Sequence, residues 1–194
     1  MHTGRFEATI GAYRLTWDRG RPYTYGYDQR RKHATLLDEI AVDGAGPQIG
    51  MLSVGPADSD WPILVIEHGH VIPWTEDLLA LDVLLVPETH ILFVGAHESV
   101  LAYDLTRPTR LWTDTAEAGF HAWRRHGRVV LMSAELELVA WDIYGRKLWA
   151  TFVEPPYDYT VTNDTVHLTV LDVPCSFPLS NGPSWGGTLP WIGH

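Results

Sequence analysis

The stretch ILFVGAHESVLAYDLTRPTRLW at residues 91–112 returns as VVLMSAELELVAWDIYGRKLW at residues 129–149. The two segments align with an offset of 38 positions until one residue of the last turn is lost, and both end in Leu-Trp, at Trp112 and Trp149. A repeat of this length is typical of small β units that cannot bury their apolar faces alone and therefore stack on their neighbours. We expect the two copies to have the same backbone shape.

Short runs of β-branched and aromatic residues, separated by Gly, Pro, Asp or Asn, dominate the chain and predict many short strands. The dipeptides His126-Gly127, Tyr144-Gly145 and Asn163-Asp164 tolerate positive φ, which favours antiparallel hairpins over crossover helices. A helical turn is expected only at residues 76–81, and residues 115–119 are predicted to be a polar connection.

The second copy contains a strand that is apolar on both faces, LELVAWDI at residues 136–143. In an extended strand Leu138 and Ala140 face one way, and Val139 and Trp141 face the other. Such a strand is predicted to lie between two neighbouring sheets.

Composition limits the classes of function. The 194 residues suit one domain, and the single cysteine, Cys175, cannot form an internal disulfide. The N-terminus lacks the pattern of an export signal, so we expect a cytoplasmic location.

No apolar run approaches the roughly 20 residues that span a bilayer, so no membrane partner is expected. Asp and Glu outnumber Lys and Arg by 24 to 14, and the net charge of −10 argues against a nucleic-acid partner.

The chain is expected to form a single β-repeat domain over residues 1–194. Gly and Pro are frequent at residues 42–62, where the longest loops are expected. The predicted division is an irregular N-terminal part at 1–81, repeat units at 82–119, 120–156 and 157–182, and a flexible tail at 183–194.

Within each copy, a strand that ends in an aromatic residue and Asp is followed by a turn and then by Leu-Trp. This pattern resembles the blade repeat of quinoprotein-type (PQQ-like) β-propellers, most closely at WDIYGRKLW, residues 141–149, and less closely at residues 103–112. The resemblance implies that Trp112 and Trp149 pack between adjacent blades, and it does not imply a bound quinone. The longer stretch containing LLVPET, TFVEPP and FPLSNGP is also similar to an uncharacterised family of small bacterial cytoplasmic proteins.

The expected fold is therefore all-β, with antiparallel repeat sheets in a propeller-like arrangement that is closed or partial. At about 38 residues per blade the chain would allow about five blades. Fewer blades, with an edge covered by the N-terminal segment or by a second subunit, are the alternative, and a β-sandwich or an open barrel are the other architectures considered.

His68 and His70 are the candidate metal ligands. A His-x-His pair on a strand projects both imidazoles from one face, which suits a divalent metal when a third ligand approaches. The third ligand is not identified by spacing; His90, His97, Asp58 and Asp60 are the residues considered. The competing interpretation places both histidines in an exposed turn.

Tyr23, Tyr25 and Tyr27 are the candidate binding residues. They alternate in RPYTYGYD, so they would share one side of an extended segment, and tyrosine is favoured in protein interfaces. The competing interpretation packs them under a loop near Trp17 or Trp61.

No set of catalytic residues and no cofactor is expected from the sequence, and Asp104 and Asp142 are predicted to cap turns rather than to act as paired acids. The leading hypothesis is a non-catalytic module that binds a protein partner, such as a basic toxin that it antagonises. The alternatives are a metal-binding protein or metal-dependent enzyme using His68 and His70, and a structural subunit that forms a homodimer by edge pairing.

Overall fold

Strands make up nearly all of the regular structure. The computed structural model describes residues 5–20, 25–40, 46–70 and 81–184. The N-terminal elements are β1 (Arg5–Ile10), β2 (Tyr13–Gly20), α1 (Tyr25–His33), β3 (Leu36–Ile40), β4 (Gly46–Pro56) and β5 (Leu64–His70). The later strands are β6 (Leu81–Val86), β7 (Ile91–Ala96), β8 (Ser99–Asp104), β9 (Thr109–Thr115), β10 (Phe120–His126), β11 (Val129–Ala134), β12 (Glu137–Asp142), β13 (Lys147–Phe152), β14 (Tyr157–Thr162), β15 (Thr165–Val170) and β16 (Val173–Pro178). No helix in these described ranges has the length and apolarity needed to cross a bilayer.

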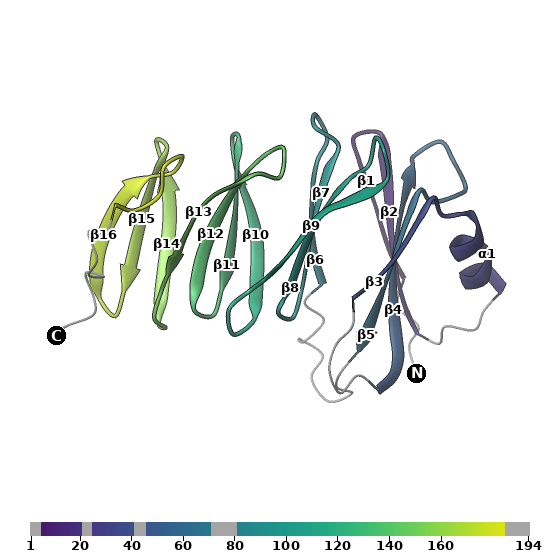
Figure 1. Cartoon of the computed structure of the whole chain (residues 1–194), viewed down its shortest axis with the longest axis horizontal. Helices are drawn as coiled ribbons and strands as arrows, with labels where there is room; N and C mark the ends of the chain where they lie inside the picture. The colour runs from purple at the N-terminus through teal and green to yellow at the C-terminus, as the bar shows by residue number, and fades with distance from the viewer. Residues whose placement is uncertain (1–4, 21–24, 41–45, 71–80, 185–194) are drawn as a thin grey trace. The chain divides into compact units, whose positions relative to one another are not determined.

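Four sheets result, in the orders β1-β2-β4-β5-β3, β6-β7-β8-β9, β10-β11-β12-β13 and β14-β15-β16 (Figure 1). The last three are meanders of consecutive strands, the arrangement found in propeller blades. The predicted all-β fold of antiparallel repeat sheets is thereby confirmed. One pair departs from it, because β3 pairs with β5 in parallel, with β4 reversing the chain direction between them.

The described residues divide into two units by their contacts. Unit 1 comprises residues 1–79 and 103–111, and unit 2 comprises residues 80–102 and 112–194. In unit 1, α1 packs on the first sheet through Tyr27, which is buried with Met51 and Val65 and contacts the half-buried Ala34. Four basic residues fill the last turn of α1, where they stabilise the negative end of the helix dipole.

The N-terminal part is more regular than expected, since it contains five strands and α1. The Gly- and Pro-rich stretch predicted to form long loops includes β4, an eleven-residue strand. Its glycines permit close packing: a Cβ on Gly50 would lie 2.5 Å from the Trp17 ring, and one on Gly55 would lie 2.7 Å from the Trp61 carbonyl oxygen. Glycine is required at these positions because a side chain would clash with Trp17 or with the Trp61 backbone, and not because the chain turns there.

The two copies of the repeat have the same strand pattern. β7 and β11 are buried at every position, and β8 and β12 are buried at their four central positions. β9 and β13 complete the respective sheets. The prediction that residues 91–112 and 129–149 form equivalent β units is confirmed, and residues 116–119 form a connection as expected.

The matched tryptophans make equivalent hydrogen bonds. Trp112 Nε1 donates to the carbonyl of Gly145 at 2.6 Å, and Trp149 Nε1 donates to the carbonyl of Leu179 at 2.7 Å. Gly145 lies in the turn between β12 and β13, in the next sheet along the chain from Trp112. Leu179 directly follows β16, the last strand of the next sheet along the chain from Trp149. Each indole therefore joins its own sheet to the next one, which confirms the structural role that the blade resemblance implied.

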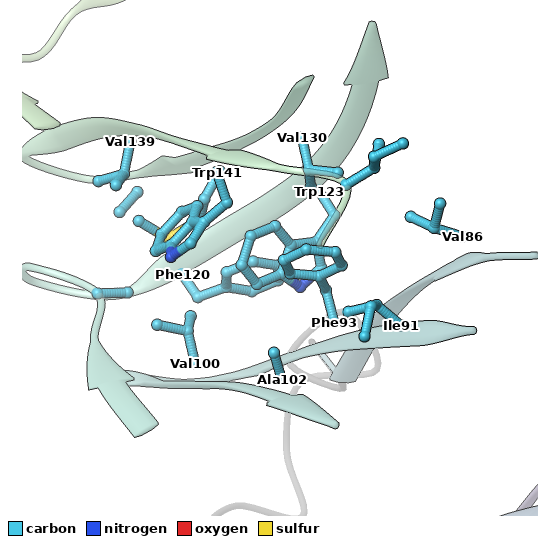
Figure 2. Close-up of a cluster of buried hydrophobic side chains, with 14 residues drawn as sticks. Val86, Ile91, Phe93, Val100, Ala102, Phe120, Trp123, Val130, Val139 and Trp141 are labelled. Carbon is cyan, nitrogen blue, oxygen red and sulfur yellow. The ribbon is translucent and has the colours of Figure 1, made fainter. Parts of the chain in front are cut away.

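An aromatic core fills the space between the β6–β9 and β10–β13 sheets. Phe93, Phe120, Trp123 and Trp141 meet there (Figure 2). Trp141 stacks on Trp112 with ring centroids 5.3 Å apart and an interplanar angle of 12°. Burying such large rings stabilises this contact strongly.

The other side of the β10–β13 sheet packs on β14–β16. Leu131, Leu138 and Ala140 are buried there together with Val166 and Leu168. The β10–β13 sheet is thus covered on both faces, as residues 136–143 predicted.

The β14–β16 sheet has three strands and only one buried face. Its inward positions are apolar, whereas its outward positions are mostly polar and exposed, for example Asp158, Thr160, His167, Thr169 and Ser176. Polar outer faces are typical of the terminal unit of a repeat stack. This sheet therefore ends the stack in unit 2.

The predicted hairpin turns form where expected. Gly127 and Gly145 have φ angles of 58° and 83°, and Asn163 and Asp164 have φ angles of 50° and 56°. Asp142 accepts hydrogen bonds from the backbone N–H groups of Tyr144 and Arg146, and Asp104 caps the preceding copy in the same way. Most of the helical turn predicted at residues 76–81 lies outside the described residues, and Leu81 begins β6.

Candidate functional site

The predicted tyrosine patch falls on a helix. Tyr25 and Tyr27 belong to α1, so the extended arrangement assumed for them is wrong, and residues two apart on a helix do not share a face. Tyr27 is 8% exposed and lies beneath the Arg31 guanidinium, with 5.8 Å between that group and the ring centroid. Tyr23 lies outside the described residues. A binding role for these tyrosines stays a prediction.

His68 and His70 both belong to β5, while their side chains lie outside what the structure describes. Asp58 and Asp60 precede β5, at the opposite end of the strand from the histidines, and four residues of strand already span about 13 Å. This placement argues against either aspartate as the third ligand. Within the described ranges no group of three His, Cys, Asp or Glu residues could hold a metal. The metal site stays a prediction.

A cleft opens in unit 2 between β10–β11 and the start of β14. Its volume is about 330 Å³, at the lower end of the range typical of ligand sites. Its lining combines charged, hydroxyl and aromatic side chains: His121, Ala122, Arg124, Ser133, Glu135, Pro155, Pro156, Tyr157, Asp158 and Tyr159. We call this the β10–β14 cleft.

Arg124 is the cation of this cleft. Its guanidinium carbon lies 5.6 Å from the centroid of the Tyr159 ring, a cation–π geometry. None of the ion pairs among the described residues involves Arg124, and the residue is exposed. The aromatic ring therefore holds the planar guanidinium in place, and the N–H donors of this group remain available to a ligand.

The two tyrosines of the cleft are hydrogen-bond donors at neutral pH. Burial raises the pKa of Tyr157 above its ordinary value, with further contributions from Tyr159 and Glu135, and the Tyr157 hydroxyl donates to the carbonyl of Ala134 at 2.5 Å. Burial also raises the pKa of Tyr159, although the charge of Arg124 opposes this effect. The β10–β14 cleft therefore contains phenols rather than phenolates.

Carboxylates lie beside Arg124 in the lining. Glu135 pairs with His121 across a distance of 3.0 Å, with both side chains about half exposed, and Asp158 is exposed. The cleft thus offers donors and acceptors together with an aromatic surface. This combination suits recognition of a polar chain segment.

Two histidines of unit 2 make side-chain hydrogen bonds that bear on catalysis. The imidazole of His121 is engaged by Glu135, and no hydrogen bond in the described part of the chain joins it to Ser133. A serine–histidine hydrogen bond does exist elsewhere, between Ser176 Oγ and His167 Nδ1 at 2.9 Å. That pair lies on the exposed outer face of β14–β16, where no third group orients the imidazole among the described residues.

Sequence reasoning missed the β10–β14 cleft, because its residues come from separate repeat units. Arg124 was visible as part of the short basic cluster at residues 124–126, and Tyr157 and Tyr159 alternate in YDYTV. Nothing in their spacing indicates that the two segments meet. The two segments come together because β14 packs on β10–β11.

No family model and no curated protein matches the chain. Solved structures similar to it include BamB from Moraxella catarrhalis, with 11% identity, a TM-score of 0.47 and coverage of 91% of this chain and 45% of that chain. The β-propeller domain of the Trilobed protease from Pyrococcus furiosus shows 7% identity, a TM-score of 0.48 and coverage of 86% and 48%. Hsv2 from Kluyveromyces lactis shows 17% identity, a TM-score of 0.31 and coverage of 52% and 33%. The chain spans less than half of the length of each of these proteins.

Proposed function

We propose that the chain is a non-catalytic protein-interaction module that binds a basic protein partner through the β10–β14 cleft. The observation that carries the proposal is Arg124, held over the Tyr159 ring without an ion-pair partner among the described residues. Arg and Tyr are the residue types that most often dominate binding energy in protein interfaces. Arg124 lies on β10 and Tyr159 on β14, so two sheets that pack against each other position the two groups.

Charge supports the choice of a basic partner. Carboxylates outnumber Lys and Arg by 24 to 14 in the chain, and Glu135 and Asp158 contribute to the lining of the cleft. Lys or Arg side chains of a partner would pair with these carboxylates, while Arg124 would bind a carbonyl or carboxylate of the same segment. A basic toxin that this protein neutralises would fit that description.

The edge of β16 disfavours the alternative of a homodimer formed by strand pairing. The N–H of Leu179 donates to the carbonyl of Asp164 and continues the β15–β16 ladder, so residues 174, 176 and 178 direct their backbone nitrogens away from β15. Two of these three residues, Pro174 and Pro178, have no N–H group. A free edge with a single donor is a poor template for another strand.

Site-specific photo-crosslinking in cells tests the proposed interaction. A photoreactive residue replaces His121 at the cleft or, as a control, Thr160 on the outer face of β14. We expect one polypeptide to be captured from His121 and not from Thr160, with a yield that falls as the salt concentration rises.

A matched pair of arginine variants then assigns the contact. Arg124 and Arg128 both lie over a tyrosine ring, at 5.6 Å and 5.8 Å, and Arg128 does not line the cleft. We expect Arg124→Ala to reduce capture about tenfold and Arg128→Ala to leave it unchanged. Equal capture from both crosslinking positions, or equal effects of the two variants, would contradict the proposal.

A further inference from the structure

A second, smaller cavity lies in unit 1, and Arg30 of α1 contributes to its lining. Its volume is about 50 Å³. The lining residues come from β1, β2, α1, β4 and the loop that joins β4 to β5: Arg5, Arg14, Thr16, Arg30, Ser53, Gly55, Pro56, Ser59, Asp60, Trp61 and Pro62. We call this the arginine cavity.

Three arginines, Arg5, Arg14 and Arg30, line this cavity, although the chain as a whole is strongly acidic. Arg30 pairs with Asp18, and Arg14 donates to the carbonyl of Ala57 and lies 3.7 Å from Glu7. Arg5 pairs with Glu7 at 3.2 Å. Glu7 and Asp18 pair with these arginines without being part of the lining themselves. Since each guanidinium has five N–H donors, donors remain for a ligand.

Ser53 supplies an unused polar group in the same cavity. The residue is only 5% exposed, and its Oγ is buried with no hydrogen-bond partner among the described residues. A buried hydroxyl without a partner destabilises a folded protein, so such groups are normally satisfied. In the sheet Ser53 lies directly opposite Thr16, which also lines the cavity. The position is suited to donating to an oxygen atom of a ligand.

At the wall of the cavity, the loop that joins β4 to β5 packs closely against β4 and α1. The loop bearing Trp61 and Pro62 approaches β4 at Gly55, where a Cβ would lie 2.7 Å from the Trp61 carbonyl oxygen. The Trp61 ring stacks on His33 of α1 with centroids 3.9 Å apart, which fixes the loop against the helix. The volume of the cavity corresponds to a few water molecules at roughly 10–15 Å³ each, which suits a small group.

We propose that the arginine cavity binds a phosphate group, either as the free ion or as a monoester. Three arginines and a buried hydroxyl match the several acceptor oxygens of a tetrahedral dianion better than the two of a carboxylate. The lining contains three arginines and one acidic residue, Asp60, and the arginines also pair with Glu7 and Asp18 outside the lining. The site is separate from the β10–β14 cleft and does not depend on the function proposed for it.

Isothermal titration calorimetry of the full chain tests the proposal, with inorganic phosphate in one arm and O-phospho-L-serine in the other, at constant ionic strength. We expect binding with a Kd of about 1 mM or tighter in at least one arm. Binding of both probes indicates a site open to monoesters, and binding of inorganic phosphate alone indicates a site for the free ion. A Kd weaker than about 10 mM in both arms overturns the proposal.

Two variants connect the binding to this cavity. Ser53→Ala removes a buried hydroxyl that has no protein partner, so we expect no loss of stability and about tenfold weaker phosphate binding. The control Ser133→Ala removes another buried serine, in the β10–β14 cleft, and should bind phosphate like the parent. Arg14→Gln should weaken binding more than Ser53→Ala does. If neither Ser53→Ala nor Arg14→Gln weakens binding, the phosphate does not occupy this cavity and the proposal is wrong.

Discussion

Glu137 shows how burial changes the chemistry of a single side chain in unit 2. Burial raises the pKa of this carboxyl, Asp114 and Glu117 act in the same direction, and Lys147 acts against them. Its Oε1 accepts a hydrogen bond from the backbone N–H of Glu117 at 3.0 Å. The carboxylate is therefore tolerated in the folded protein at some cost to stability at neutral pH.

The first prediction concerns the pH dependence of this cost. A carboxyl group with a raised pKa in the folded state contributes stability below its unfolded pKa, near 4.3, and that contribution is lost as the pH rises through the folded value. Glu137→Gln keeps the acceptor oxygen and removes the charge. We expect it to increase the free energy of unfolding at pH 7, by less than about 1 kcal/mol because the group is half exposed, and to have no effect below pH 4.

Urea unfolding at pH 4 and pH 7 measures the difference, with the exposed Glu154→Gln as the control. A loss of stability at pH 7 in Glu137→Gln would show that the carboxylate is favourable where it lies.

At the scale of elements, a tryptophan hydrogen bond joins β6–β9 to β10–β13 and another joins β10–β13 to β14–β16. Trp149 of β13 is 8% exposed, packs edge-on against Phe177 and donates its indole N–H to Leu179. Gly182 lies against the same ring, since a Cβ there would approach Trp149 Cγ to 2.4 Å. Trp112 of β9 has the matching hydrogen bond but is only half buried. The repeated residue thus has the same role with a different degree of burial.

This difference predicts unequal effects of truncation. Trp149→Ala should lower the free energy of unfolding by roughly 3–5 kcal/mol, because it leaves a cavity and an unpaired carbonyl at Leu179. Trp112→Ala should cost less, since part of that ring is already in contact with water. Chemical denaturation followed by circular dichroism measures both values. A loss below about 1 kcal/mol for Trp149→Ala would mean that this residue does not join the two sheets.

Sequence alone identified the parts of the fold in which local pattern and tertiary packing agree. The two-sided apolar strand at residues 136–143 could be interpreted correctly because both of its faces are buried in the same way along the strand. Tyr25 and Tyr27 were misplaced because alternation suggested a strand, whereas a helix forms with its basic last turn and Tyr27 packs on Met51 and Val65. The stretch containing β4 was misread because Gly50 and Gly55 serve close packing.

The candidate sites could not be predicted from the sequence, for a related reason. Arg124 and Tyr159 belong to different repeat units, and Ser53 becomes informative only when its hydroxyl is known to be buried and unpaired. Such juxtapositions depend on which sheets pack together. The repeat predicted that sheets stack, but not which polar residues would line the spaces between them.

At the scale of the whole molecule, the central claim is that the repeat units of unit 2 share a continuous interior. The β10–β13 sheet is covered on one face by β6–β9 and on the other by β14–β16. The outer face of β14–β16 is polar, so the stack in this unit ends there. Strands covered on both faces should open only with global unfolding, and strands at the end of the stack should open more easily.

Native-state hydrogen exchange tests this claim most directly. We predict that backbone amides of β11 and β12, at residues 129–134 and 137–142, exchange more slowly than any others in unit 2, with free energies of opening that equal the global value. The β16 amides, which belong to Val173, Cys175, Ser176 and Phe177, should exchange at least tenfold faster through local opening. Exchange of β11 and β12 as fast as that of β16 would contradict the account, because it would mean that these strands are not enclosed between two sheets.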